Sequence, residues 1–288
     1  MLSIPAPAGD RQLKRLIVCA DDFGLDPTVN EAVERAHRCG ILSTASLMVG
    51  APAAADAVAR ARRLQSLSVG LHLVLVDGRP LLSEAAKGLV RGDGAFDRNL
   101  GRAAIRAFLS PTARRQLARE IRAQFEAFRA TGLVLDHVNA HKHMHLHPVI
   151  ARLIVEIGGA YGMQAVRVPD EPVGALRRAF PDEHYPPPLY RPWVEVLRRR
   201  LARAGLSTND HLFGIAWSGG MIEERLLRLM PHLPDGVSEI YFHPAAEAGG
   251  RGEGDYRRRE ELAALLSARV KERIAELGIA FTRYRDLV

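Results

Sequence analysis

The stretch RLIVCADDFG, residues 15–24, joins an apolar run to two adjacent carboxylates. The apolar residues 16–20 are typical of a strand that is buried on both faces of a parallel sheet. The run ends at Asp21 and Asp22, whose negative charges repel each other, so a positive charge nearby must compensate for them. Because a strand points neighbouring side chains in opposite directions, a turn must begin at this pair if both carboxylates serve one site. The following Gly24 makes such a turn reasonable.

Strand-like apolar runs alternate with helical periodicities along the 288 residues. The predicted strands are residues 15–20, 43–49, 69–74, 133–138, 165–168, 213–217, 238–242 and 279–281. The predicted helices are residues 29–36, 57–64, 117–128, 147–160, 190–204, 221–230 and 262–277. Seven or eight β-α units without a linker-like break predict a single α/β domain over residues 1–288, a closed or nearly closed (β/α) barrel. A doubly wound open sheet is the alternative. Residues 77–111, rich in glycine and charge, are predicted to be an inserted loop region.

Composition and short motifs exclude several classes of protein. The net charge is +7 and the pI about 9.8, but aromatic residues make up only 6% and no RNA-binding signature occurs, so we expect no nucleic-acid partner. The arginine clusters 198–200 and 257–259 are interpreted as solvated helix faces. No GxGxxG or GxxxxGK[ST] motif supports nucleotide chemistry. Two cysteines, no apolar signal-peptide core and no long uncharged apolar run favour a cytoplasmic protein.

Titratable side chains collect where the predicted strands end. Asp21 and Asp22 close the first strand, His72 lies near the end of the third, and Arg167 and His243 lie at the ends of two later strands. In a parallel barrel, the carboxyl ends of the strands form the rim that carries the active site. A random scatter would not place so many titratable groups at this boundary, so we expect the site there.

The run HKHMHLH, residues 141–147, carries histidines at four alternate positions. An extended segment would place all four on one face, whereas a helix would pair His141 with His145 and His143 with His147. Either geometry can bring one or two imidazoles to a metal. With His72 and a carboxylate, they would form a two-histidine, one-carboxylate set with positions open for water and substrate. A divalent cation would then stabilise the carboxylate pair, and this ligand chemistry favours zinc or another imidazole-binding metal.

Three motifs in this order resemble the YdjC/ChbG-like carbohydrate deacetylase family: ADDFG at residues 20–24, GLHL at 70–73 and HxHxH at 141–145. The resemblance extends from Asp21 to His243. It implies a distorted TIM-like deacetylase barrel, related in layout to NodB-type polysaccharide deacetylases. The stretches GILSTASLMVGAPAAADAVARAR and VGLHLVLVDGRPLLS look most like the hopanoid-biosynthesis-associated deacetylases. Those are implied to deacetylate an N-acetylglucosaminyl hopanoid lipid.

The resemblance also implies a role for individual residues. The implied metal ligands are Asp22, His72 and His141, and the implied metal is magnesium rather than zinc. Asp21 would be the general base, Arg167 would pair with that base, and His243 would be the general acid. His143 and His145 are candidate substrate contacts, and helical spacing also keeps His145 open as an alternative ligand.

These motifs predict a metal-dependent N-deacetylase acting on an N-acetylglucosaminyl lipid or saccharide. Alternatives are a deacetylase of chitooligosaccharides or another N-acetylated saccharide, a non-catalytic glycolipid-binding barrel, and a metal-dependent phosphoester hydrolase. The last class usually needs two metals and more carboxylates than this site offers. Residues 186–200 combine prolines, Trp193 and arginines, which could rest on the inner membrane surface or form an ordinary amphipathic helix against the barrel. The sequence does not predict the oligomeric state.

Overall fold

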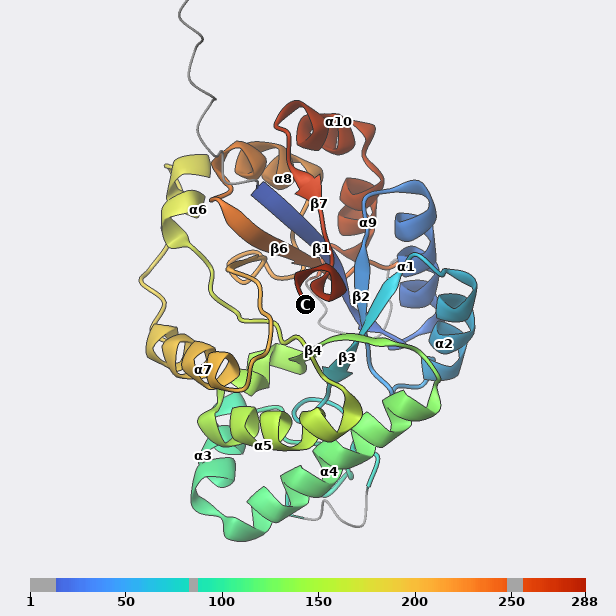
Figure 1. Ribbon diagram of the computed structural model, residues 1–288, viewed down its shortest axis with the longest axis vertical. Helices are drawn as coiled ribbons and strands as arrows, with labels where there is room; N and C mark the ends of the chain where they lie inside the picture. Colours follow the sequence, from blue (N-terminus) through green and yellow to red (C-terminus); the bar gives the residue numbers. More distant parts are fainter. Residues whose placement is uncertain (1–13, 83–87, 248–255) are drawn as a thin grey trace, which may run out of the picture.

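The computed structural model describes residues 14–82, 88–247 and 256–288, and shows a curled parallel sheet surrounded by helices (Figure 1). The strands pair in the order β4-β3-β2-β1-β6-β5 along this curled sheet, and β7 pairs with β1. The predicted α/β barrel is therefore confirmed. The strands are β1 (Lys14–Phe23), β2 (Thr44–Leu47), β3 (Ser68–Leu73), β4 (Leu135–Ala140), β5 (His211–Phe213), β6 (Gly236–Phe242) and β7 (Ala280–Phe281).

Helices cover the outside of the sheet (Figure 1). The α-helices are α1 (Pro27–Cys39), α2 (Ala54–Arg63), α3 (Leu100–Leu109), α4 (Pro111–Ala130), α5 (Pro148–Gly158), α6 (Val173–Ala179), α7 (Arg191–Arg203), α8 (Glu223–Leu229), α9 (Arg258–Leu266) and α10 (Ala268–Glu276). The 3-10 helices are η2 (His141–Leu146), η3 (Gly159–Tyr161), η4 (Met230–His232) and η5 (Tyr284–Leu287). Within the described residues, none of these helices is long and apolar enough to span a bilayer.

Between β4 and β5 the barrel wall is irregular. The strand predicted at residues 165–168 forms only isolated parallel bridges, from Val166 to Val138 in β4 and from Ala165 to Ser207. Pro169 follows at once and has no N–H for a continuing ladder. The bridges still connect β4 to the segment that leads into β5, so this wall is distorted.

Three other segments differ from their sequence predictions. The expected loop region at 77–111 contains α3, whose first turn is capped by the Asn99 side chain; residues 83–87 lie outside the described chain. The helix predicted over 262–277 is two helices, because Ser267 has extended backbone angles and its hydroxyl caps α10. The strand predicted at 213–217 ends at Phe213, where Gly214 takes a φ of +123°.

Strand β1 is the central strand and is buried on both faces, as its apolar run predicts. Ile17 and Cys19 contact residues that fill the inside of the barrel, whereas Leu16 and Val18 belong to the large core beneath the helices. Side chains therefore alternate along β1 between the barrel interior and the helical layer. By this alternation Asp21 follows Ile17 and Cys19 into the barrel interior.

Close packing inside the barrel predicts that Gly70→Ala is destabilising. A Cβ on Gly70 would lie 2.5 Å from Cε1 of His137 and 2.6 Å from its carbonyl oxygen. We expect a loss of roughly 1–3 kcal/mol in the free energy of unfolding, measured by urea denaturation. Gly159→Ala is the control, because nothing lies within 4 Å of that Cβ. Equal stabilities of the two variants would contradict the prediction.

Candidate active site and metal centre

A left-handed turn at Asp22 brings both carboxylates of the adjacent pair to one site. Asp22 has a φ of +61°, and the register between β1 and β2 shifts between Ala20 and Phe23. As a result, both side chains approach the same imidazole: Oδ1 of Asp21 lies 4.0 Å from Nδ1 of His72, and Oδ1 of Asp22 lies 3.7 Å from its Nε2. The turn expected from the sequence is therefore present.

Asp22, His72 and His141 form a cluster with the geometry of a metal site. Oδ1 of Asp22 lies 3.5 Å from Nδ1 of His141, and that nitrogen lies 3.4 Å from Nε2 of His72. Oδ1 of Asp22 is buried and has no hydrogen-bond partner. A buried, unpartnered carboxylate oxygen beside two imidazole nitrogens fits a divalent cation, and three protein ligands leave positions open. The identity of the cation does not follow from this donor set.

Protonation favours metal binding at this cluster. Burial, only partly offset by Asp21 and Asp22, lowers the pKa of His72 to about 4, so the imidazole is neutral at neutral pH. Nδ1 of His72 lies 2.8 Å from Oδ1 of Asn139, an acceptor, and must therefore carry the proton. This hydrogen bond leaves the lone pair of Nε2 directed at the cluster. Burial raises the pKa of Asp22, but His141 and His243 outweigh it and hold the pKa well below its usual range.

Asp21 accepts four hydrogen bonds from nitrogen and hydroxyl donors. Arg167 donates to both oxygens, from Nη1 to Oδ2 over 2.6 Å and from Nη2 to Oδ1 over 2.9 Å. Ser46 and Asn139 also donate to Oδ1, over 3.0 and 3.1 Å. Burial raises the pKa of Asp21, but Arg167 outweighs burial and keeps the pKa well below its usual range. Asp21 is therefore ionised and fixed in orientation.

Arg167 is fully buried and serves two carboxylates at once. Besides Asp21, it contacts Glu239 of β6, with Nη2 donating over 2.6 Å and Nε over 3.0 Å to Oε1. The pairing with Asp21 that the resemblance implied is present. Glu239 was missed in the sequence, because an acidic residue in the middle of a strand gives no signal of a partner far along the chain.

Arg258 corrects the interpretation of the arginine cluster at 257–259 as a solvated helix face. Its side chain is buried at the start of α9, and Nη2 donates to Oδ2 of Asp22 over 3.4 Å. Nη1 donates to the carbonyl oxygen of His243 over 3.3 Å. Positive charge for the carboxylate pair therefore comes from two arginines, Arg167 for Asp21 and Arg258 for Asp22, as well as from any bound cation.

The histidine run is neither extended nor a regular helix. It forms η2 with left-handed residues at Lys142 and His143, where φ is 51° and 54°. This kink turns the later imidazoles away from Asp22. Nε2 of His143 lies 3.3 Å from the Tyr241 hydroxyl, and Nε2 of His145 lies 3.1 Å from the carbonyl oxygen of Arg167. Neither is among the residues that line the cavity described below, so the substrate contacts suggested for them stay predictions.

His243 follows β6 beside the same carboxylates. Its Nδ1 is buried without a partner, and its ring lies 4.8 Å from that of Tyr256. Burial lowers the pKa of His243, and the carboxylates of Asp22 and Asp21 oppose that shift. The backbone N–H of His243 donates to Glu261 of α9, which holds the main chain at this strand end.

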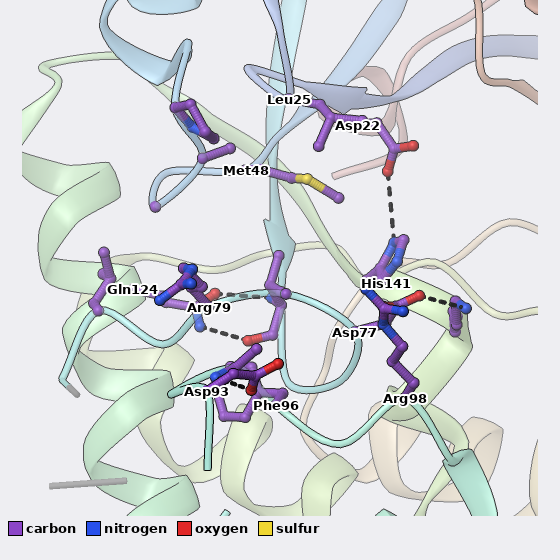
Figure 2. A pocket seen from close by; sticks show the side chains of 18 of the residues that line it. Asp22, Leu25, Met48, Asp77, Arg79, Asp93, Phe96, Arg98, Gln124 and His141 are labelled. Atoms are coloured by element: carbon purple, nitrogen blue, oxygen red, sulfur yellow. Dashed lines mark hydrogen bonds and ion pairs between the residues drawn. The ribbon is translucent and has the colours of Figure 1, made fainter. Parts of the chain in front are cut away.

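A cavity of about 730 Å³ opens beside the cluster, with Asp22 and His141 in its wall (Figure 2). Apolar side chains such as Met48 and Phe96 line it together with charged ones such as Arg79. All four non-glycine residues with left-handed φ in the described chain lie in this wall or next to it, namely Asp22, Asp77, Lys142 and His143. Such strain persists where a surrounding structure enforces it, which is typical of functional sites.

Sequence reasoning missed Ser46 and Asn139 as well. Asn139 carried a signal, because it ends β4 two residues before His141, at the same rim as the other polar groups. Ser46 carried none: a serine inside an apolar strand is common, and its role depends on β2 lying beside β1.

The profile of the YdjC-like protein family matches residues 15–276. The chain belongs to the YdjC-like family. Among curated relatives, a carbohydrate deacetylase from Brevibacillus brevis is 29% identical over 95% of this chain and 99% of its own length. A carbohydrate deacetylase from Vibrio vulnificus is 33% identical over 95% of this chain and 96% of its own length, and one from Mus musculus is 31% identical over 95% and 94%.

Solved structures agree on the fold. A crystal structure from Enterococcus faecalis, named as a candidate cellobiose-phosphate cleavage protein, superposes with a TM-score of 0.76. It covers 96% of this chain and 99% of its own length at 24% identity. At that identity the likeness shows the shared architecture of the two chains and nothing of their substrates.

The cluster predicts which histidines bind metal. His72→Ala and His141→Ala each remove a nitrogen that faces Asp22. Loss of a residue that only supports a metal ligand weakens metal binding by up to roughly 100-fold, so we expect loss of a ligand itself to weaken it by more. Calorimetric titration of the metal-stripped protein with Zn²⁺ and with Mg²⁺ measures this. His147→Ala, in the same run but outside the cluster, is the control and should bind normally. Unchanged affinity in the first two variants would exclude the site.

Proposed function

We propose that this chain is a metal-dependent carbohydrate N-deacetylase that hydrolyses the acetamide of an N-acetylglucosaminyl group. The observation that carries the proposal is the unpartnered Oδ1 of Asp22 facing His72 and His141 in the wall of a cavity, with a second carboxylate alongside. The family match and the relatives named as carbohydrate deacetylases support the same chemistry.

Amide hydrolysis needs an activated water, stabilisation of the developing oxyanion and a proton for the leaving amine. Asp22, His72 and His141 would hold the cation, which would polarise the acetyl carbonyl and acidify the attacking water. Asp21 is ionised and lies against His72, so it can accept the proton of that water as the general base. Arg167 donates to both oxygens of Asp21 and so prevents the carboxylate from rotating.

His243 supports the last step of this reaction. His243 feels the charges of both carboxylates and its Nδ1 has no partner, so a protonated imidazole could donate to the amine of glucosamine as the carbon–nitrogen bond breaks. No serine or cysteine nucleophile is required. Neither Ser46 nor Cys19 is suited to attack, since both are fully buried beneath Asp21.

The finer proposal is that the sugar is linked to a hopanoid lipid. It rests on the resemblance of residues 40–62 and 69–83 to hopanoid-associated deacetylases, and exposed apolar side chains support it. On α3 these are Leu100, Ile105, Phe108 and Leu109, and beside or on α7 they are Leu189, Trp193 and Val196. Both helices pack against α5, which follows the histidine run (Figure 1). Surfaces of this kind mark contacts with lipid or protein, so we also propose peripheral binding to the inner membrane surface.

Asp21→Asn tests the base. We expect the variant to turn over the substrate at least about 100-fold more slowly than the wild-type protein, because the asparagine side chain cannot accept the proton of the water. Metal occupancy should stay nearly unchanged, since Asp21 is not part of the cluster around Asp22. Acetate release and metal analysis of the purified variant provide the two measurements. Full activity would remove Asp21 from the mechanism.

The substrate is tested by mass spectrometry of an N-acetylglucosaminyl hopanoid and of chitobiose before and after incubation. Loss of one acetyl group from the lipid, but not from chitobiose, is the expected result. The reverse preference would support the chitooligosaccharide alternative. Loss from neither would favour a non-catalytic glycolipid-binding barrel, and hydrolysis of an aryl phosphate instead would favour a phosphoesterase.

Membrane contact is tested by co-sedimentation with vesicles that contain phosphatidylglycerol, at low salt. We expect the wild type to bind, and the double variant Ile105→Ser with Leu189→Ser to bind about fivefold or more weakly, because two exposed apolar contacts are lost. Val134→Ser is the control, since the exposure of Val134 lies between those of Ile105 and Leu189 but Val134 lies just before β4. No sedimentation of the wild type would discard the membrane proposal.

A further inference from the structure

The 3-10 helix η5 closes the end of the barrel opposite the active site. The preceding strand β7 pairs with Arg15 and Leu16, at the start of β1, whereas Asp21 and Asp22 lie near its end. The Tyr284 side chain enters the barrel interior and packs with Ile17 and Val237. Figure 1 shows the last turn of the chain in the middle of the ring of strands.

A first chain of hydrogen bonds leads from Tyr284 to Asp21. The Tyr284 hydroxyl donates to Oε2 of Glu239 over 2.6 Å. Glu239 accepts from Arg167 through both oxygens, over 2.6 Å from Nη2 to Oε1 and over 3.1 Å from Nε to Oε2. Arg167 in turn donates to both oxygens of Asp21. Three contacts therefore join the C-terminal turn to the proposed base.

A second chain reaches the same carboxylate from Arg285. The backbone N–H of Arg285 donates to Oδ1 of Asp136 over 3.1 Å, and Oδ2 of Asp136 lies 2.9 Å from Nδ1 of His137. Nε2 of His137 lies 3.1 Å from the Ser46 hydroxyl, which donates to Oδ1 of Asp21 over 3.0 Å. Because carboxylates only accept hydrogen bonds, Nδ1 of His137 must carry a proton toward Asp136. The single proton of the Ser46 hydroxyl goes to Asp21, so the link between Ser46 and His137 also requires a proton on Nε2 of His137.

Both chains are built into the interior of the protein. The side chains of Glu239, Arg167, His137 and Ser46 are at most 1% exposed, and Tyr284 is fully buried. The His137 ring stacks on Tyr284 with centroids 4.6 Å apart, so the two chains also touch each other. The His137 ring also lies close to Gly70, where an added Cβ would be 2.5 Å from Cε1 of the ring.

Charge explains why this support matters to Asp21. Two buried carboxylates, Asp21 and Glu239, share the single guanidinium of Arg167, so they compete for its N–H groups. The Tyr284 hydroxyl satisfies one oxygen of Glu239 and reduces that competition. Without the hydroxyl, Glu239 would draw Arg167 toward itself and loosen its two contacts with Asp21.

We propose that η5 positions the reactive carboxylate from the far end of the barrel, with Tyr284 and the Asp136–His137 pair as positioning residues. The inference rests on the proposed function, because the task of Asp21 is defined there. None of these residues reaches the cavity, so each acts only through Asp21 and its direct partners.

The test is Tyr284→Phe, which removes one hydroxyl and keeps the ring that stacks on His137. We expect kcat for acetate release to fall about tenfold, as for other supporting hydrogen bonds, with KM and the metal affinity of the stripped protein unchanged. Tyr161→Phe is the matched control, because the Tyr161 hydroxyl also donates to a glutamate over 2.6 Å but does so at the surface. It should leave kcat unchanged.

A second variant, Ser46→Ala, cuts the other chain and keeps the test valid if Tyr284→Phe does not fold. The combined variant should lose less than the sum of the two separate effects on the activation free energy, because both chains orient the same carboxylate. A lower melting temperature with unchanged kcat in both single variants would show a purely structural role and overturn the proposal. Absence of acetate release by the wild type would instead remove the proposed function, and with it the task assigned to Asp21.

Discussion

The buried ion pair between Arg167 and Asp21 is the interaction on which the site depends. A carboxylate at the inner end of β1 would otherwise be an uncompensated charge in a medium of low dielectric constant, which costs several kcal/mol. Arg167 removes that cost and also fixes the plane of Asp21, because its fork of N–H groups contacts both oxygens. Glu239 on the opposite side of the guanidinium holds the fork in place.

This arrangement divides the tasks of two adjacent aspartates. Asp21 has its oxygens satisfied by protein donors, whereas Oδ1 of Asp22 has none and faces two imidazole nitrogens. The difference arises from one backbone angle, the left-handed φ of Asp22, which interrupts the alternation of β1. In the proposed mechanism, these two neighbouring residues of the same charge would have different tasks, Asp21 as the base and Asp22 as a metal ligand.

Much of the site could be predicted from the sequence because parallel barrels place the ends of their strands together. The grouping of Asp21, Asp22 and His72 with the histidine run followed from the polar residues at those ends, and the resemblance singled out His141 within the run. The kink at Lys142 could not be predicted, since extended and helical backbones were both consistent with alternate histidines, and neither is present. The break between α9 and α10 at Ser267 could not be predicted either, because the apolar periodicity continues from one helix into the next.

The sequence by itself determined the buried strand β1, the barrel class and the residue types at the rim of the barrel. The strand and the barrel class follow from local periodicity. The rim follows because parallel strands all end at the same edge of the sheet. Only the tertiary structure decided which charges compensate one another. Glu239, Arg258 and Tyr284 are separated from their partners by tens to hundreds of positions, and no local pattern marks a pair formed through space. The pair of Arg167 with Asp21 was expected only from the family resemblance, not from a local pattern. Burial then makes each of these pairs obligatory, because a charge inside the barrel has no water to replace a missing partner.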